Sequence, residues 1–487
     1  MALAAAIALA ANPSGGNAAP RPTPTFAERA ADAVETIRRH WYAGHGRFRL
    51  CADCVDATAS DWGADSLIDV LYLRWLLTRD PALVGLFREI VEGEPGDTLG
   101  GFSDVPMWDA VAAIRAYDVT GDPRALTQAR REYDALATSR HFALAPCPAI
   151  DTQLRDGGGS GIRTLETDAN RILVGASLAG RVRDPIYARR ALADAVRRYD
   201  AVRAAFLGPG TPLYSVYLFP RSGRCVREPR RQLFASVNGR MIEAGLVLTA
   251  VTHDERFARD AHDTATAIAS LRDNRGVFVD LQAQNDVVAP LVVAMLQLAR
   301  AGAPPAWLVW NARAMGSSRR ADGAYGRFFD GPPPPRDASV SVFETNGGLA
   351  LAVAAAPFAP LARGPDDDWQ LAQHHPIAIR AAPARYAFHG SGIAFIGPLP
   401  APGDPLCRPL TVGNCEGGRV AIRVDGRLPA SEVGIWQGKS LVPSAATVLF
   451  AWRWATSGDH VIDFDPVTPN PKQGDTALDL REAVVLP

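Results

Sequence analysis

The stretch ADSLIDVLYLRWLLT-RDP at residues 64–81 decides the fold, because its closing turn is repeated along the chain. The turn TRDP at 78–81 recurs as TGDP at 120–123 and VRDP at 182–185, and more loosely as THDE at 252–255. The aspartate can cap the next helix by accepting backbone N–H bonds, and a proline at the first helical position loses no hydrogen bond. Such a repeat indicates a repeated helical hairpin.

Helices are predicted on both sides of each turn. The pairs are expected at residues 64–78 and 81–92, 105–119 and 123–138, 166–181 and 185–205, 236–251 and 255–271, and 286–301 and 304–316, with two more helices at 340–355 and 26–43. The first helix of each pair is rich in Ala, Leu, Val and Ile all round, as a buried helix should be. Six inner helices enclosed by six outer ones predict a mainly α protein, an (α/α)6 six-hairpin toroid.

Long loops precede the inner helices, whereas the turns from inner to outer helices are short. These loops are expected at residues 44–61, 93–104, 140–163, 207–233, 272–285 and 317–338. Loops gathered on one face of a rigid scaffold commonly carry the functional site. The glycine-rich run GGGSG at 157–161 follows no strand and is interpreted as a mobile loop at the mouth.

The character of the chain changes after about residue 365. The run GPDDD is typical of a solvated linker, and the segments that follow are short, β-rich and bounded by Gly, Pro, Asp or Asn. About a hundred residues of this pattern predict a β-sandwich. We therefore assign residues 1–23 to a signal-peptide remnant and linker, 24–364 to the toroid, 365–383 to a linker, and 384–487 to a small, jelly-roll-like β-sandwich that could bind carbohydrate.

Charge and apolar runs limit the possible partners. The 51 basic residues balance 52 acidic ones for a net charge of −1, which gives no electrostatic support for nucleic-acid or membrane-surface binding. The apolar run at residues 2–11 is too short to span a bilayer but suits the core of a signal peptide. A charged segment before it is missing, so either the start was assigned too late or this is no signal. We expect a monomer without a membrane span.

The six cysteines support export. An even number with local pairs is typical of disulfides outside the cytoplasm; the pairs are Cys51 and Cys54, Cys407 and Cys415, and Cys147 and Cys225. Zinc binding by the CxxC segment is the alternative, but a second ligand pair is missing. No P-loop, HExxH or GxSxG motif occurs either. The prediction is a secreted, periplasmic or cell-surface protein with no metal and no cofactor.

Several motifs in order resemble glycoside hydrolase family 76, the α-1,6-mannanases. The segments are FSDVPMW at 102–108, TDAN at 167–170, NGRMIEAGL at 238–246, WNAR at 310–313 and GAYG at 323–326. The resemblance covers most of residues 26–355 and implies a six-hairpin glycosidase that acts on an α-linked polysaccharide, as an endo-α-1,6-mannanase does. In the C-terminal part, VDG at 424–426 and GDHVI at 458–462 resemble galactose-binding-like jelly rolls, which often bind sugars.

One departure from the family concerns the chemistry. The family has two consecutive aspartates four and three residues before the tryptophan, and here these positions hold Asp104 and Val105, before Trp108. The resemblance implies that Asp104 is the nucleophile, while the general acid/base is missing from its expected place. A helix N-terminus favours the charged carboxylate, which suits a nucleophile. The alternative is that Asp104 only caps its helix.

A second carboxyl could come from another inner helix, because glycoside hydrolysis needs two. The candidates at helix starts are Asp65, Glu166, Asp168 and Asp286. Each could instead be a cap or a solvated residue at the mouth. Asp168 is preferred because it lies in the matched TDAN segment. Asp109 lies about 140° round the helix from Asp104 and is expected to face elsewhere.

Aromatic and amide side chains near the same rim are the candidates for sugar binding. Trp62 and Trp108 could stack on pyranose rings, or could simply be packing residues. The polar residues on otherwise apolar inner helices are Asn170, Asn238, Glu243 and Asn346. Buried polar groups need partners, so these residues either bond sugar hydroxyls or tie inner helices together. For Glu243 the second role is favoured.

Three functions remain open. The first is a glycosidase with Asp104 and Asp168 as catalytic residues and with Trp62, Asp65, Trp108, Glu166, Asn170, Asn238 and Asp286 in substrate binding. The second is a glycan-binding protein that kept the toroid and lost the acid at Val105. The third is a lyase or another six-hairpin carbohydrate-active enzyme, which would need a Tyr, His or Arg at the centre of the cavity.

Overall fold

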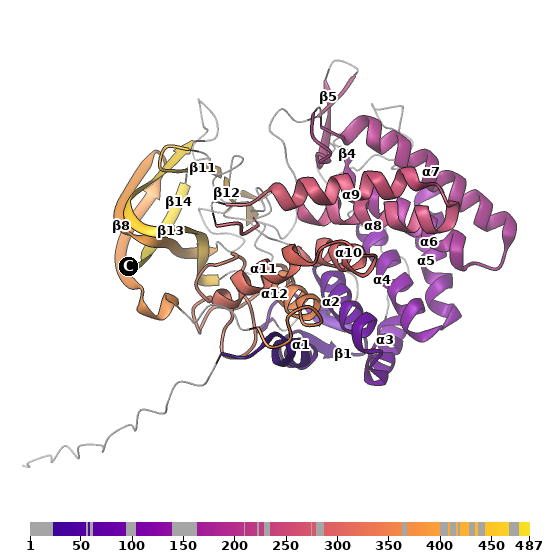
Figure 1. The fold of residues 1–487 in the computed structure, drawn as a ribbon, viewed down its shortest axis with the longest axis horizontal. Helices are drawn as coiled ribbons and strands as arrows, with labels where there is room; N and C mark the ends of the chain where they lie inside the picture. Colours follow the sequence, from indigo (N-terminus) through magenta and orange to yellow (C-terminus); the bar gives the residue numbers. More distant parts are fainter. Residues whose placement is uncertain are drawn as a thin grey trace, which may run out of the picture.

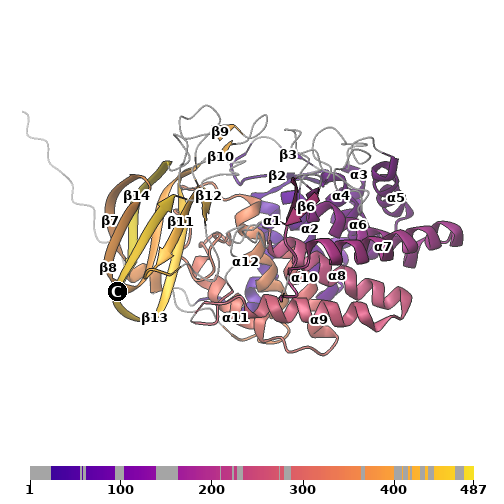
Figure 2. The same ribbon diagram turned by 90° about the horizontal axis from the view of Figure 1, so that it is seen from above.

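The protein has a helical domain followed by a β-domain (Figures 1 and 2). The computed structural model describes residues 23–54, 57–58, 62–93, 104–138, 163–208, 210–221, 224–227, 234–273, 275–278, 287–362, 368–399, 408–409, 415–416, 419–427, 434–436, 444–466 and 477–487. No helix in these ranges is long and apolar enough to cross a membrane.

Twelve α-helices in the described ranges alternate between an inner and an outer layer. They are α1 (Phe26–His40), α2 (Trp62–Thr78), α3 (Pro81–Gly93), α4 (Val105–Thr120), α5 (Pro123–Thr138), α6 (Leu165–Arg181), α7 (Pro185–Phe206), α8 (Ala235–Thr252), α9 (Glu255–Ser270), α10 (Ala289–Arg300), α11 (Ala306–Met315) and α12 (Val342–Ala355). The even-numbered helices are buried on all sides over most of their length, whereas the odd-numbered ones bury one face. Each inner helix packs on the next, and α12 packs back on α2. The predicted (α/α)6 toroid is confirmed.

The repeated turn caps helices as its sequence predicts. Asp80 Oδ1 accepts from the backbone N–H of Ala82 at 2.9 Å, and Asp184 Oδ1 accepts from Ile186 at the same distance. Asp122 and Asp254 do the same for the helices that follow them. The capping aspartate therefore starts the second helix of four hairpins. This local signal explains why the helix boundaries could be placed to within three residues at most ends.

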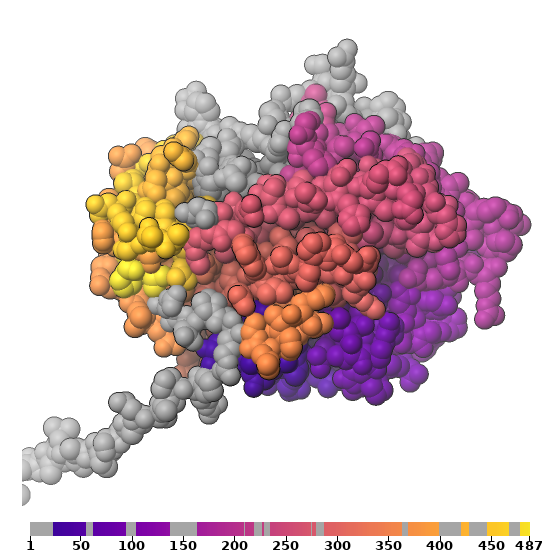
Figure 3. All heavy atoms as spheres, in the orientation of Figure 1, coloured from indigo at the N-terminus to yellow at the C-terminus, as the bar shows by residue number. Residues whose placement is uncertain are grey.

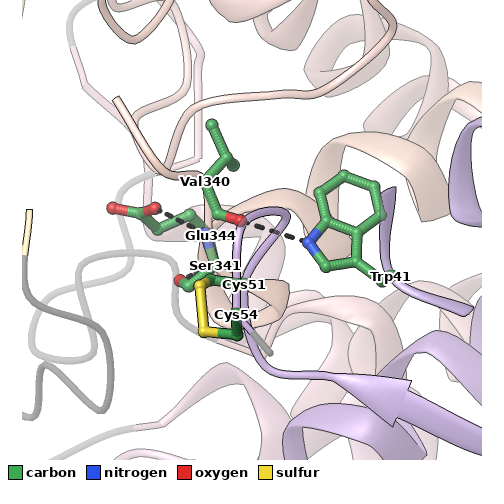
Figure 4. Close-up of a disulfide and its surroundings, with 6 residues drawn as sticks. All are labelled: Trp41, Cys51, Cys54, Val340, Ser341 and Glu344. Carbon is green, nitrogen blue, oxygen red and sulfur yellow. Dashed lines mark hydrogen bonds between the residues drawn. A yellow bond between two sulfur atoms is a disulfide. The ribbon is translucent and has the colours of Figure 1, made fainter. Parts of the chain in front are cut away.

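The segment that follows α1 is joined to the start of α12 (Figure 4). The strands β1 (Tyr42–Gly44), β2 (Arg47–Arg49) and β3 (Ala57–Thr58) follow α1, and a disulfide links Cys51 to Cys54 just beyond β2. The indole of Trp41 donates to the carbonyl oxygen of Val340 at 3.1 Å. The backbone N–H of Val342 donates to the carbonyl oxygen of Leu50 at 3.0 Å. These bonds attach the segment of β1 and β2 to the start of α12.

The remaining cysteine pairs stay predictions. The Cys51–Cys54 pair is confirmed as a disulfide. Cys147 and Cys407 lie outside the described residues, so their pairing with Cys225 and Cys415 stays open.

The other short elements complete the helical domain. A small sheet is formed by β4 (Arg163–Thr164), β5 (Tyr217–Arg221) and β6 (Arg224–Arg227), and a 3-10 turn, η2 (Gly316–Ser318), follows α11. Through β4, this sheet leads directly into α6. Asp286, one of the candidate site residues, lies outside the described residues.

The β-domain contains a six-stranded antiparallel sheet in the order β12-β11-β13-β8-β14-β7. Its strands are β7 (Gln373–Ala381), β8 (Ala384–Leu399), β11 (Arg419–Val424), β12 (Gly434–Trp436), β13 (Ser444–Pro466) and β14 (Ala477–Leu486); η3 (Asp368–Leu371) precedes them, and β9 (Arg408–Pro409) pairs with β10 (Cys415–Glu416).

Two long strands turn a corner and fold this sheet into two layers. The rings of Tyr386 and Phe395 in β8 are 5.5 Å apart, although nine extended residues would span about 30 Å. The strand therefore bends between them, where Gly390 lies so close to the backbone of Leu486 that a Cβ could not fit. The pairing partner β13 is irregular at the same level, between Arg453 and Gly458. Both layers cover one apolar core, as predicted for a sandwich.

The sheet begins earlier than the sequence predicts. Residues 365–383 were assigned to a linker, but β7 lies within them and pairs with β14. Only its two isoleucines, Ile377 and Ile379, alternate toward the core. The short apolar pattern with Pro376 in its middle is typical of an edge strand and gives a weak sequence signal.

The two domains pack through a shared apolar cluster. Phe328 of the helical domain and Trp369 of η3 contact the face of the sheet that carries Ile396, Val448 and Leu486. The space-filling view shows the β-domain against the helices (Figure 3).

Asp330 provides the polar part of this contact. The indole of Trp369 donates to its carbonyl oxygen at 3.0 Å, and its carboxylate pairs with Arg453 of β13 at 3.0 Å and with Arg275 of the helical domain.

Candidate functional site

Four buried charges meet in the centre of the helical ring. Arg115 of α4 and Arg240 of α8 each contact both Asp69 of α2 and Glu243 of α8, at distances from 2.6 to 3.2 Å. Their side chains are at most 4% exposed. Gln297 of α10 donates to Glu243 at 3.0 Å. We call Asp69, Arg115, Arg240 and Glu243 the charge quartet. It ties the inner helices α2, α4 and α8 together, and Gln297 adds α10; for Glu243 this confirms the favoured prediction.

The charge quartet holds its charges firmly. Burial disfavours the charged guanidinium of Arg115, but Glu243 and Asp69 outweigh burial and raise its pKa well above the usual range. Burial likewise acts to raise the pKa of Glu243, but the attraction of Arg115 outweighs it and the pKa is lowered. Both shifts favour the charged forms of Arg115 and Glu243. The quartet therefore has a structural role and does not act as a general acid or a general base.

The quartet also sets the depth of the site. Its residues and Gln297 lie five to ten residues into their helices, which at about 1.5 Å per residue places them roughly 8–15 Å from the helix starts. Residues that meet at a similar depth show that these inner helices run parallel. Their first turns therefore lie together at one face of the ring, above the quartet.

Trp108 lies on the quartet. The guanidinium carbon of Arg240 is 4.9 Å from the centre of the indole ring, and the side chain of Trp108 is 1% exposed. Asp104 precedes Trp108 by four residues, so it lies on the same face of α4, one turn nearer the mouth. Asp104 is half-buried, and its side chain makes no capping hydrogen bond to α4. The geometry thus gives no support to the interpretation of Asp104 as a cap alone.

Asp65 and Trp62 belong to the first turn of α2. Asp65 is 2% exposed and precedes Asp69 by four residues, on the same face of the helix. Because Asp69 reaches the quartet, this face points to the centre of the ring. Trp62 is half-buried, and its ring lies 4.2 Å from that of Phe343 in α12. That contact is the packing role considered for Trp62.

Asp168 is held by arginines from outside the inner ring. Its carboxylate accepts from Arg163 of β4 at 2.7 Å and lies 3.9 Å from Arg198 of the outer helix α7. It is fully buried. Glu166, two residues earlier, is half-buried in the first turn of α6, where its N–H donates to the capping hydroxyl of Thr164.

Two of the inner-helix asparagines bond the backbone. Asn238 accepts from the N–H of Tyr214 at 3.0 Å and donates to two carbonyl oxygens. Asn346 accepts from Ala289 and donates within its own helix. These contacts tie elements together.

Asn170 differs from the other two asparagines. It is fully buried, and in the part of the chain that the structure describes neither its Oδ1 nor its Nδ2 has a hydrogen-bond partner. The same holds for Oγ1 of Thr167 and Nε1 of Trp108. An unsatisfied buried polar group costs about 1–3 kcal/mol. These groups lie in the first two turns of the adjacent inner helices α4 and α6.

Sequence reasoning missed three of the four quartet residues. Asp69 and Arg115 each interrupt an otherwise apolar inner-helix run, and Arg240 follows the matched Asn238-Gly239 pair. Opposite charges inside helices predicted to be buried on all sides are the signal that could have found them. Within the described ranges no group of three His, Cys, Asp or Glu residues is arranged to hold a metal.

Comparison with known proteins identifies the fold. No family model matches the sequence, and no curated protein matches it. The GH76A α-1,6-mannanase from Salegentibacter sp. HEL1_6 superposes with a TM-score of 0.57 at 17% identity, over 68% of this chain and 99% of that chain.

Two further solved structures agree. An inactive variant of the Salegentibacter enzyme, with two consecutive aspartates replaced by alanine and α-1,6-mannotetrose bound, gives the same TM-score, identity and coverage. A family 76 glycoside hydrolase from a bovine Bacteroides thetaiotaomicron strain gives 0.56 at 14% identity, over 69% of this chain and 78% of that chain. The protein is thus a six-hairpin toroid protein, and its fold is that of glycoside hydrolase family 76, as the motif resemblance predicts.

Proposed function

We propose that this protein is a glycoside hydrolase that acts on an α-linked polysaccharide, in the manner of an endo-α-1,6-mannanase. The observation that carries the proposal is the position of Asp104. It stands at the start of an inner helix, one turn above a buried tryptophan that rests on the charge quartet. The Salegentibacter enzyme is inactive when two consecutive aspartates are replaced. The motif resemblance implies that Asp104 corresponds to the first aspartate of such a pair.

Asp104 is the proposed nucleophile. The positive end of the α4 dipole favours its carboxylate form. Attack on the anomeric carbon would form a glycosyl ester that water then cleaves, as in retaining glycosidases. Trp108 presents a ring and an indole N–H one turn below, and Thr167 and Asn170 supply buried groups for sugar hydroxyls. Asp168 has two arginine neighbours instead, which favours a structural role for this residue.

The test is cleavage of α-1,6-mannan by the wild type and by Asp104→Asn, followed as new reducing ends. We expect the variant to lose at least 10³-fold in kcat, because the nucleophile is gone, while circular dichroism and the melting temperature stay close to those of the wild type. The matched control is Asp118→Asn, which changes an aspartate near the far end of α4 that pairs with Arg181. Activity in Asp104→Asn equal to the wild type would contradict the assignment.

A glycan-binding protein without activity is the second candidate, and Val105 favours it. Hydrolysis needs a second carboxyl, and valine cannot donate a proton. This candidate predicts that the wild type and Asp104→Asn bind mannan oligosaccharides equally in calorimetry and that neither releases reducing ends.

A lyase finds less support in the ring. Arg115 and Arg240 are committed to two carboxylates, so they cannot neutralise an acidic sugar. Burial raises the pKa of Tyr72 to about 12, and its hydroxyl donates to Asp118 at 3.3 Å. A phenol that keeps its proton is a poor base.

Export is proposed together with this activity. The Cys51–Cys54 disulfide and the apolar run at residues 2–11 both suit a secreted, periplasmic or cell-surface enzyme. Such a location fits a polysaccharide substrate.

A further inference from the structure

The proposed hydrolysis needs a second carboxyl, and Val105 does not supply it. The inference that follows rests on the proposed function and concerns where this group comes from. Four carboxyls of the described inner helices α2, α4 and α8 lie on faces that point to the centre of the ring. Asp69 and Glu243 are fixed by the arginines of the charge quartet. Asp65 and Asp104 lie in the layer above it.

The register of α2 and α4 places these two aspartates at a similar level on neighbouring helices. Asp69 and the ring of Trp108 contact the same guanidinium, that of Arg240, at 2.7 Å and 4.9 Å. They therefore lie next to the same side chain. Asp65 precedes Asp69 by four residues, and Asp104 precedes Trp108 by four residues. Each aspartate thus lies one helical turn nearer the mouth than a residue known to reach the centre.

The environments of the two carboxyls differ in the way that the reaction requires. Asp65 is 2% exposed in the first turn of α2, and removal from water in general acts against the charged form of a carboxyl. Asp104 is half-buried at the end of α4, where the dipole favours the carboxylate. A buried acid beside a charged nucleophile is the pairing that retaining glycosidases use.

Other aspartates on the neighbouring helices are less suitable. Asp168 is bonded to Arg163 and lies near Arg198, both outside the inner ring. Asp109 follows Trp108 directly and is turned about 140° from Asp104 round α4. Its carboxyl therefore does not share the face that Trp108 presents to Arg240.

We propose that Asp65 is the general acid/base of this enzyme and takes the place of the aspartate that Val105 replaces. The Asp104 carboxylate attacks the anomeric carbon, the glycosidic C–O bond breaks, and Asp65 gives its proton to the leaving oxygen. Asp65, now a carboxylate, takes a proton from water. The resulting hydroxide attacks the same carbon, the ester bond to Asp104 breaks, and both carboxyls return to their starting states.

The test compares two substrates on Asp65→Asn. On α-1,6-mannan, whose leaving group needs a proton, kcat/KM falls by 10²- to 10⁴-fold. On a 2,4-dinitrophenyl α-1,6-mannotrioside, whose leaving group needs none, the first step stays within about tenfold of the wild type and gives a burst of dinitrophenol. Azide then restores turnover and yields the glycosyl azide, because azide needs no general base.

Matched variants separate this role from a structural one. Asp109→Asn, the same change in a buried aspartate of α4, should affect both substrates equally and gain nothing from azide. Asp65→Glu keeps a carboxyl and should lose more on mannan than on the aryl substrate. A third variant combines Asp65→Asn with Val105→Asp and should regain mannan hydrolysis relative to Asp65→Asn.

The possible outcomes are distinct. Equal losses on both substrates in Asp65→Asn without azide rescue would overturn the assignment. A large loss on mannan with a small loss on the aryl substrate and azide rescue in Asp109→Asn would overturn it as well. A wild type inactive on both substrates would overturn the proposed function and this inference with it.

Discussion

Asp194 of α7 illustrates what a single aspartate contributes when arginines surround it. Its carboxylate accepts from Arg198 at 2.8 Å and from Tyr133 at 2.7 Å, and Arg171 lies at 3.4 Å. Burial acts to raise its pKa, but Arg198 and Arg171 outweigh burial and lower the pKa to about 2. The contacts join α5, α6 and α7, so the charge of one residue holds three helices.

This pKa predicts an acid dependence of stability. A lowered pKa means that the contribution of Asp194 is complete above its unfolded value of 3.8 and is lost as the pH falls from there toward 2. The shift corresponds to about 2 kcal/mol. We expect Asp194→Asn to lose less of its remaining stability than the wild type between pH 4 and pH 2, measured as urea midpoints. Asp263→Asn, in an exposed position on α9, should keep the slope of the wild type; equal slopes for all three proteins would contradict the prediction.

At the residue scale the sequence predicted positions on helices better than roles. The motif that contains Asp104 and Trp108 predicts the start of an inner helix, and both residues lie at the start of α4. Asp168 was chosen from the TDAN segment, but its partners Arg163 and Arg198 are five and thirty residues away and could not be paired with it by spacing. Whether a carboxyl reaches substrate or an arginine is decided by tertiary contacts, which a motif does not contain.

The inner helices are the elements on which the site depends. Apolar on most sides, they pack as a closed ring around the charge quartet. A buried ion cluster adds little net stability when complete, but removing one member leaves an uncompensated charge.

We therefore expect Glu243→Gln to lower the free energy of unfolding by about 3–5 kcal/mol, because Arg115 and Arg240 would then share the single carboxylate of Asp69. Urea unfolding followed by circular dichroism measures this. The double variant Glu243→Gln/Arg115→Gln should regain part of the loss. Glu255→Gln, exposed at the start of α9, should change stability by less than about 0.5 kcal/mol; a similar small effect of Glu243→Gln would show that the quartet is dispensable.

At the element scale the helices were predictable and the sheet less so. Capping aspartates are local signals that placed the starts of four outer helices, and continuous apolar runs are local signals that placed the inner helices. The corner of β8 depends on the approach of Leu486 to Gly390, almost a hundred residues apart, and β7 is an edge strand whose pattern is interrupted by Pro376. Non-local pairing leaves no comparable local trace.

Asp330 links the two domains of the whole molecule. Its carboxylate contacts Arg275 and Arg453 from different domains, and its backbone adopts the left-handed conformation with φ 62°. Asparagine tolerates that conformation, so Asp330→Asn removes the charge without straining the backbone. The domain contact would then depend on the apolar cluster around Phe328 and Trp369.

We expect calorimetry to show this as a loss of coupled unfolding. The wild type should unfold in one transition, and Asp330→Asn in two, as the β-domain melts separately from the helical domain. Asp337→Asn, an exposed neighbour on the same loop, should keep the single transition. A single unshifted transition in Asp330→Asn would mean that the apolar cluster alone couples the domains.

The attachment of the first hairpin to α12 has a consequence for how the chain reaches this form. The indole of Trp41 donates to a carbonyl oxygen 299 residues later in the sequence. The backbone N–H of Phe26 donates to the carbonyl oxygen of Ala362. A ribosome must therefore synthesise the whole helical domain before the seam between α1 and α12 can close, and until then the inner helices at both ends of the growing ring expose apolar faces. Nascent chains are expected to need a chaperone or a translocation channel for most of their synthesis, and to become resistant to protease in a single late step.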